Sequence, residues 1–421
     1  MQDLAARLRD LPIEVFSVPE PDEAWARGAL ADLSDRALLE VTARAIERPK
    51  QSASSSFVLH APLELVARAR LLPSVSPSTR GPARRRIAEI GARYAASGPE
   101  ADLTDHTYPD AGAAFTDLEA ALAAGDPTRA DAAIGFLGAA MDPGDLATSL
   151  TDVVVPALGA AAHAPILLAG ALTSSEGRDM FPRLIRAPIR YLAMDWTRRL
   201  TWMRRSPVLA PEQEGLVETL LAAPRVTSTS MSIAPTMLAV EADGLAQRLL
   251  AGPTTRLSPA EAERALLRVA AWSMLWDAPA HAPYGWTHCL TLPQAVLTLA
   301  RVARDPRAAI RVAATHVLGF RAILSSGPVE PRDPPPPCRG ATLADASPSE
   351  AASLAFHADP DQRPAIMSFL ATRAAGHADA HLAKYTLACF DAASRDPEAS
   401  PLFLAAAAYL GAWWEENPGA P

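Results

Sequence analysis

The sequence predicts an all-α protein built from many short helices. Apolar residues recur at helical spacing through most of the chain, and 39 prolines separate the apolar segments. Alternating β-branched stretches are nearly absent; residues 225–231 are the best strand candidate and read equally well as a loop. The hydrophobic content of 49% is that of a packed globular protein. Although the length alone allows two or three domains, we expect one large bundle-like helical domain over residues 1–421.

Capping signals and apolar periodicity place the helices of the first third of the chain. Proline, aspartate, serine or threonine opens each apolar segment, and Asp126 and Ser258 each precede a proline that suits the first helical turn. These signals predict helices over residues 22–47, 52–70, 82–96, 111–124 and 128–140.

Two later segments need separate interpretations. Residues 153–173 are uncharged and about long enough to span a bilayer. Two prolines, a central histidine and many alanines argue against a span, so we expect a buried core helix or helix pair. Residues 325–350 contain Asp333 followed by four prolines, which predicts a surface loop.

The bulk composition excludes several classes of partner. A net charge of −8 with scattered arginines argues against a nucleic-acid surface. Three widely spaced cysteines form no CxxC pattern and fit a reducing cytoplasm. The N-terminus carries acid early and lacks the regions of a secretion signal. We expect a cytoplasmic protein with neither a membrane nor a nucleic-acid partner, and its oligomeric state stays open.

One lysine indicates a special site. Of the 39 lysine and arginine residues only two are lysines, and one of them, Lys384, lies in an apolar stretch. That stretch, residues 376–393, reads as a helix with His377, His381 and Asp391 on the same face as Lys384. A buried lysine can be neutral, whereas an arginine cannot be deprotonated in a protein. We therefore expect an amine at a metal site.

The histidines recur in apolar contexts. His60, His163 and His281 each precede Ala-Pro, and His288 and His316 share the pattern Thr-His-x-Leu. A single histidine of this kind is usually a core residue bonded to a backbone carbonyl, but each separate buried ring needs its own partner. One shared ion would satisfy several rings, and imidazole suits iron, zinc, copper and nickel.

Other metal and catalytic motifs are absent from the sequence. It contains no HExxH, no Glu-x-x-His and no glycine-rich phosphate loop. His357 and His377 each stand two residues before an aspartate, and helix positions two apart point to nearly opposite sides. We expect both histidines at the surface.

Five motifs together resemble the questin oxidase-like family, helical iron oxygenases that open anthraquinone rings in aromatic polyketide pathways. In chain order they are FVLHAPLELVARARLL, AAHAPILLAGALTSS, WTHCLTLPQA, ATHVLGFRAILSS and DAHLAKYTLACFDAA, spread over roughly residues 60–391. The chain departs from the family pattern after His316, where Val-Leu-Gly stands in place of an expected threonine.

The resemblance implies a mononuclear Fe(II) held by four histidines and a carboxylated lysine. Lys384 would be that lysine and His381 a ligand on the same helix, and these two are the expected catalytic residues. Four histidines compete for the three remaining ligand positions, which is one candidate too many: His60, His163, His288 and His316. His281 is a reserve candidate for the position of His288.

The resemblance also implies the reaction. Dioxygen would be the co-substrate and NADPH an optional reductant, and a small polycyclic aromatic substrate would undergo oxidative C–C cleavage. An aromatic stripe is more often part of the hydrophobic core than a substrate site. The expected substrate contacts are nevertheless four aromatic residues near His288: Trp272, Trp276, Tyr284 and Trp286.

Two further hypotheses stay open. A metal-dependent hydrolase would use a carbamylated Lys384 to hold two zinc or nickel ions, with Asp391 as the available bridging partner. A non-catalytic α-helical interaction protein would keep its histidines in the core and let Lys384 snorkel to the surface. Metal content separates the three hypotheses: about one iron per chain, two zinc or nickel ions, or none.

Overall fold

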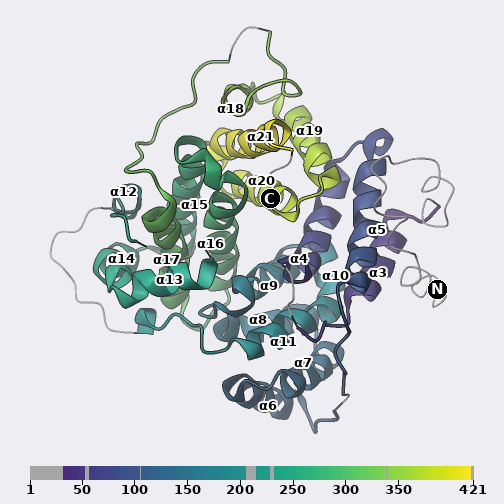
Figure 1. Ribbon diagram of the computed structural model, residues 1–421. Helices are drawn as coiled ribbons and strands as arrows, with labels where there is room; N and C mark the ends of the chain where they lie inside the picture. The colour runs from purple at the N-terminus through teal and green to yellow at the C-terminus, as the bar shows by residue number, and fades with distance from the viewer. Residues whose placement is uncertain are drawn as a thin grey trace. The chain divides into compact units, whose positions relative to one another are not determined.

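The computed structural model describes residues 32–52, 56–104, 106–204, 215–227, 232–337 and 340–418. Helices follow one another through these ranges and no β-strand occurs in them (Figure 1), which confirms the predicted all-α fold. Extended pairing within them is limited to two isolated bridges, Lys50 with Glu100 and Ala157 with Arg199. Within the same residues, no helix has the length and apolar character needed to cross a membrane.

The chain divides into two compact units. The first comprises Met1–Leu150, Gly159–Thr197 and Ala375–Ala380. The second comprises Thr151–Leu158, Arg198–Ala374 and His381–Pro421. The expectation of one domain over the whole chain stays a prediction.

The first unit is built from short helices joined by tight connections. In order they are α3 (Asp35–Ile46), α4 (Ser56–Leu71), α5 (Gly81–Ala96), α6 (Ala111–Ala124), α7 (Pro127–Ala140), α8 (Pro143–Val154), α9 (Ala164–Thr173), α10 (Ser175–Leu184) and α11 (Arg186–Met194), with 3₁₀ turns η2 (Leu72–Ser74), η3 (Pro77–Thr79) and η4 (Gly159–Ala162). The last residues of α8 belong to the second unit. Within this unit α3 and α4 pack on α5, α6 on α7, and α9 on α10.

Capping explains where these helices begin. Asp126 Oδ1 accepts the N–H groups of Thr128 and Arg129, so α7 starts where its sequence signal predicts. Ser34 Oγ accepts the N–H of Ala37 at 3.2 Å, and α3 therefore begins at Asp35. The predicted helix over residues 22–47 is thus too long at residues 32–34, and its residues 22–31 lie outside the described ranges.

The uncharged stretch 153–173 contains two helix segments rather than one. α8 ends at Val154 and α9 begins at Ala164. Between them, Ala160, Ala161 and Ala162 have φ values of 51°, 54° and 55°, a left-handed turn of three alanines. No single helix can run through such a turn, so the helix-pair interpretation applies.

The second unit carries the longer helices. They are α12 (Leu216–Leu221), α13 (Ile233–Ala242), α14 (Leu245–Thr255), α15 (Pro259–Trp276), α16 (Thr287–Ala300), α17 (Pro306–Leu324), α18 (Pro348–Phe356), α19 (Arg363–Gly376), α20 (Ala380–Arg395) and α21 (Ser400–Glu416), with 3₁₀ turns η5 (Trp202–Arg204), η6 (Pro279–His281) and η8 (Pro397–Ala399) and a π-helical turn η7 (Ala282–Trp286). α16 lies beside α15 and α17, and α21 packs on α15 and α18 (Figure 1). The last residues of α19 and the first residue of α20 belong to the first unit.

Local signals explain two features of this unit. Ser258 and Glu261 form a capping box that starts α15, as the sequence indicates. Residues 325–337 and 340–347 contain no helix, and the prolines at 335–337 are exposed. The predicted loop over residues 325–350 is wrong at its end, because α18 begins at Pro348. The strand candidate 225–231 is not a strand over residues 225–227, where the N–H of Val226 donates to Ala322 O at 2.8 Å, and its remaining residues lie outside the described ranges.

Candidate metal centre

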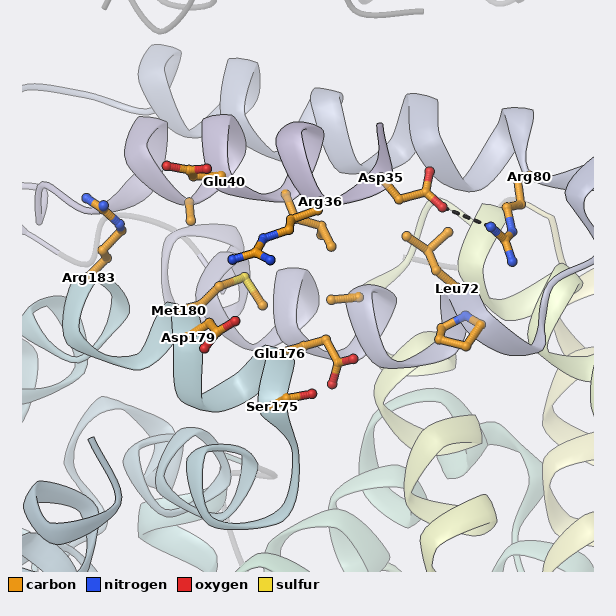
Figure 2. A pocket seen from close by; sticks show the side chains of 14 residues that line it. Asp35, Arg36, Glu40, Leu72, Arg80, Ser175, Glu176, Asp179, Met180 and Arg183 are labelled. Atoms are coloured by element: carbon orange, nitrogen blue, oxygen red, sulfur yellow. Dashed lines mark hydrogen bonds and ion pairs between the residues drawn. The ribbon is translucent and has the colours of Figure 1, made fainter. Parts of the chain in front are cut away.

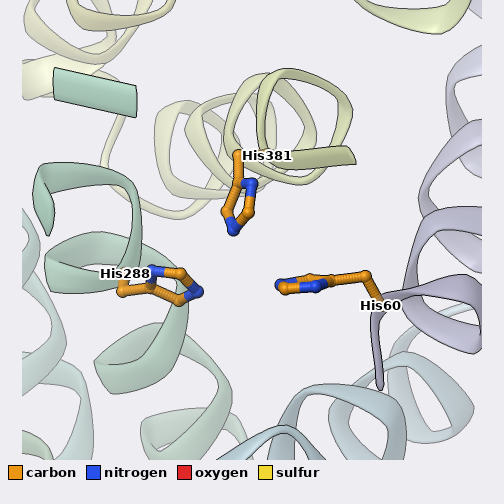
Figure 3. Close-up of side chains that lie close together, drawn as sticks. All are labelled: His60, His288 and His381. Carbon is orange, nitrogen blue, oxygen red and sulfur yellow. The ribbon is translucent and has the colours of Figure 1, made fainter. Parts of the chain in front are cut away.

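Two imidazole rings meet inside the second unit. His288 of α16 and His381 of α20 have ring centroids 4.9 Å apart with an interplanar angle of 75° (Figure 3). They are 8% and 6% exposed, respectively. The buried amide of Gln294 ties the two helices together, because its Nε2 donates to Ala388 O at 2.7 Å. The fold therefore fixes two nitrogen donors at close range.

A backbone carbonyl fixes the tautomer of His288. Its Nδ1 lies 2.5 Å from Tyr284 O, and a carbonyl only accepts, so Nδ1 carries the proton and Nε2 the lone pair. His60, on α4 of the first unit, has the same arrangement, with Nδ1 2.7 Å from Ser56 O. Metal-binding histidines commonly donate their second ring N–H in this way. In both residues Nε2 is the atom suited to a metal.

The carbonyl that orients His288 comes from the π-helical turn η7. Thr287 Oγ1 donates to Pro283 O at 2.8 Å and to Tyr284 O at 3.1 Å. A Cβ at Gly285 would collide with Leu324 Cδ1, so any larger residue here would require the Leu324 side chain of α17 to move. Turns of this wide type occur frequently at functional sites.

A buried ion pair holds the segment that leads into η7. Arg321 of α17 and Asp277, directly after α15, are 2.7 Å apart with side chains 0% exposed. Asp277 also accepts the N–H and hydroxyl of Ser326, at 2.7 and 2.9 Å. Breaking such a pair from one side leaves a buried charge and costs about 3–5 kcal/mol. The approach to Tyr284 and His288 is thus rigidly placed.

Lys384 lies one helical turn beyond His381 and is 5% exposed. Burial holds the pKa of His381 well below its usual value, and the charges of Lys384 and His288 lower it further. The Lys384 side chain is buried, so it does not snorkel to the surface as an interaction protein would require. The protein environment favours neutral nitrogen donors here.

The predicted helix over residues 376–393 is wrong at its start. α19 ends at Gly376 and α20 begins at Ala380, with His377 between them. The His377 Nδ1 accepts the N–H of Asp379 at 3.0 Å, so the ring bonds the backbone ahead of α20 instead of continuing a helix. His377 is half-buried rather than at the surface, and it does not share a helix face with His381.

A second imidazole pair lies in the first unit. His60 and His163 have ring centroids 4.4 Å apart and are 6% and 2% exposed. His163 directly follows the left-handed turn Ala160–Ala162 and precedes α9. Left-handed backbone costs roughly 1–2 kcal/mol for each non-glycine residue. Strain of this kind tends to gather at functional positions.

His316 is placed differently from the other predicted ligands. It lies on α17 and is 1% exposed, and burial lowers its pKa to about 4. Its Nδ1 has no hydrogen-bond partner among the described residues. The described side chains that could hold a metal together do not include it. The structure thus gives no support to His316 as a ligand, and it reads as a buried neutral core residue.

The structure separates the four predicted substrate contacts. The Tyr284 ring lies 4.9 Å from that of His381. Trp276 instead donates to Arg332 O and stacks under its guanidinium at 4.1 Å, while Trp286 is 0% exposed and donates to Ala278 O at 3.1 Å. Trp272 is half-buried on α15. Of the four, Tyr284 is the residue with a described ring contact to a predicted ligand.

Sequence reasoning missed Trp414. The ring centroid of Trp414 lies 6.3 Å from that of Tyr284, although the two residues are far apart in the sequence. The available signal was the Trp-Trp pair at the end of an apolar alanine-rich segment. Nothing in that pattern names its partner, because the contact arises from the packing of α21 on η7.

The first unit also has an open groove of about 690 Å³ that is separate from these histidines. Arg36 of α3 faces Glu176, Asp179 and Met180 of α10 across it, and Arg80 pairs with Asp35 at one end (Figure 2). Neither histidine nor cysteine lines the groove. It therefore offers no nitrogen or sulfur donors for a transition metal.

Comparison of the chain with family models, with curated proteins and with solved structures gave no match. The resemblance to the questin oxidase-like family therefore stays a prediction that rests on the five motifs.

Proposed function

We propose that this protein is an Fe(II)- and O₂-dependent oxygenase that cleaves a C–C bond of a polycyclic aromatic, anthraquinone-type polyketide. The observation that carries the proposal is the buried pair His288 and His381 with Lys384 one helical turn away. Two imidazoles and a neutral amine form a donor set that suits a divalent transition metal. The three positions are also those that the family resemblance selects.

His60 is proposed as a third nitrogen ligand, and His163 beside it as a fourth, because the family resemblance implies histidine ligands on their helices. Support comes from the shared anchoring of His60 and His288, each with Nδ1 on the carbonyl four residues earlier. That anchoring presents Nε2 and raises the basicity of the ring, as expected of metal ligands. His316 is left out of the proposed set because no described ring contact joins it to another predicted ligand, whereas the ring of His163 contacts that of His60.

Lys384 is proposed to act as an anionic oxygen ligand after carboxylation. Its burial favours the neutral amine, and a neutral amine can add carbon dioxide. The resulting carbamate would balance part of the charge of the ion. Arginine at this position could not do so, because it stays protonated.

Iron(II), when bound, supplies the ability to activate dioxygen toward an electron-rich ring. The chain's own residues bind and orient: the carbonyl-anchored imidazoles stay fixed, and the half-buried Tyr284 ring offers a flat contact for an aromatic substrate. Burial of the donors keeps water away from the reacting atoms. The expected product is a ring-opened carboxylic acid.

The proposal is tested by purifying the untagged protein without oxygen, measuring its iron, and following oxygen uptake with an anthrone or anthraquinone. We expect about one iron per chain and substrate-dependent uptake. Lys384→Arg should lose the iron, whereas the same change at the other lysine, Lys50→Arg, should retain it. Two zinc or nickel ions per chain with no oxygen uptake would instead indicate the hydrolase, and no bound metal would overturn both enzyme hypotheses.

A further inference from the structure

A row of aromatic rings leads away from the histidine pair within the second unit. The Tyr284 ring lies 4.9 Å from that of His381, Trp414 lies 6.3 Å from Tyr284, and Trp413 lies 5.3 Å from Trp414. The interplanar angles are 82°, 78° and 87°, so each contact is edge to face. Every ring in the row touches the next.

The row joins buried and half-buried rings. His381 and Trp414 are 6% and 5% exposed, and Tyr284 and Trp413 are half-buried. The residues that follow Trp413 and Trp414 on α21, Glu415 and Glu416, are exposed. The row therefore starts at a buried imidazole and ends at the protein surface. Ordinary edge-to-face packing explains each pair of rings by itself. It does not explain why the pairs form a continuous series from a proposed metal ligand to the solvent.

We propose that Tyr284, Trp414 and Trp413 carry single electrons between the histidine site and the surface. This inference rests on the proposed function for its purpose, which is to discharge a strongly oxidising equivalent left at the site when dioxygen is activated there without a substrate. Tyrosine and tryptophan are the side chains that give up one electron most readily, and rings in contact exchange electrons quickly. The electron donor at the surface is a small thiol.

Each transfer along the row conserves electrons and protons. The oxidised site takes one electron from Tyr284, whose phenolic proton passes to water at this half-buried side chain. The tyrosyl radical regains an electron from Trp414 and a proton from water, and Trp414 regains its electron from Trp413. A thiol then reduces Trp413 and releases its proton, and two oxidised thiols join as a disulfide.

The test uses the full chain, both as purified and after removal of metal. A ruthenium photo-oxidant is attached to a cysteine introduced as Glu416→Cys, three residues from Trp413 on α21, in a Cys338→Ser background. The described native cysteines, Cys289 and Cys389, are buried and should not be labelled. A light flash then oxidises Trp413, and transient absorption and electron paramagnetic resonance follow the radicals.

We expect a tryptophan radical that decays as a tyrosyl radical appears. Trp414→Phe should slow the appearance of the tyrosyl radical roughly tenfold or more, because electron transfer weakens exponentially with distance. Tyr284→Phe should abolish the tyrosyl radical and prolong the tryptophan radical. The matched control is Trp276→Phe, a half-buried tryptophan outside the row, which should leave both signals unchanged.

A folded parent protein that forms no tyrosyl radical, or a folded Trp414→Phe variant with an unchanged rate, would overturn the inference and leave a packing role only. Circular dichroism establishes folding in each case. Radical transfer without any iron binding would count against the proposed function alone, because the metal-free measurement does not depend on iron. Iron binding without radical transfer would count against the aromatic row alone.

Discussion

Tyr284 acts through two separate groups, and a substitution can separate them. Its backbone carbonyl anchors His288, while its ring faces His381. Tyr284→Ala keeps the carbonyl and removes the ring. Because an aromatic contact contributes about 0.5–1.5 kcal/mol, we expect KM for the aromatic substrate to rise up to roughly tenfold with iron content unchanged. Steady-state kinetics and metal analysis measure this, and Trp276→Ala, whose ring stacks on Arg332, should leave KM unaltered.

His316 makes stability depend on pH. Burial lowers its pKa to about 4, below the ordinary value of 6.5. Between pH 6.5 and pH 4 the His316 ring is therefore protonated in the unfolded chain but neutral in the folded chain. Its contribution to the free energy of unfolding is present above pH 6.5 and is lost as the pH falls toward 4. We expect about 2 kcal/mol to be lost between pH 7 and pH 5 on this account.

Denaturant unfolding of wild type and His316→Leu at both pH values checks this expectation. His381 and the half-buried His281 also have lowered pKa values and act in the same direction. The difference between the two proteins isolates His316. Equal pH dependence in both would show that the ring is protonated or solvated in the folded state.

At the level of secondary-structure elements, the π-helical turn η7 depends on one glycine. A Cβ at Gly285 would collide with Leu324 of α17. We expect Gly285→Ala to destabilise the fold by about 1–3 kcal/mol through overpacking, and to weaken iron binding because Tyr284 O would shift away from His288. Adding Leu324→Ala should restore iron binding by removing the collision. Thermal unfolding with metal analysis measures both effects, and a double variant no better than the single one would contradict the packing explanation.

The left-handed turn before α9 gives a second prediction for an element. Ala161 has a φ of 54°, which disfavours any residue with a Cβ. Ala161→Gly should therefore stabilise the protein by about 1 kcal/mol. Ala169→Gly, inside the regular helix α9, should destabilise it by a similar amount. The midpoint of denaturant unfolding reports both signs, and a destabilised Ala161→Gly variant would show that the turn is right-handed in solution.

For the whole molecule, the proposed ion should stabilise the fold, because the ligands His288 and His381 come from two different helices, α16 and α20. A ligand that binds only the folded chain stabilises it, by about 2.7 kcal/mol at a free concentration one hundred times the Kd. We expect ferrous iron to raise the Tm, a chelator to reverse the rise, and His381→Ala to abolish it. An unchanged Tm on iron addition would argue against a metal that joins the ligands.

The parts of the fold that could be predicted from sequence are those set locally. Asp126 and Ser258 mark helix starts through their own side-chain hydrogen bonds, so capping rules find them. The break at His377 depends on one ring bonding Asp379 N–H, which apolar periodicity does not encode. The boundaries of the two units likewise follow from tertiary packing.

The site divides in the same way. Motif order singled out His288, His381 and Lys384, and the odd lysine was visible in composition alone. The distinction between His316 and the anchored histidines needs the carbonyl four residues before each ring, and a helix offers that carbonyl to every histidine. The contact of Trp414 with Tyr284 depends on how α21 packs on η7, so spacing along the chain gives no indication of it.

The sealed carboxylate–guanidinium contact between Asp277 and Arg321 has a consequence for how the protein would acquire its ion. It braces the turn that carries Tyr284 O without any help from a metal, so the imidazole of His288 is preorganised before loading. Binding of the ion would then require little ordering of the chain, and repeated removal and addition of the metal should leave the arrangement of the ligands unchanged.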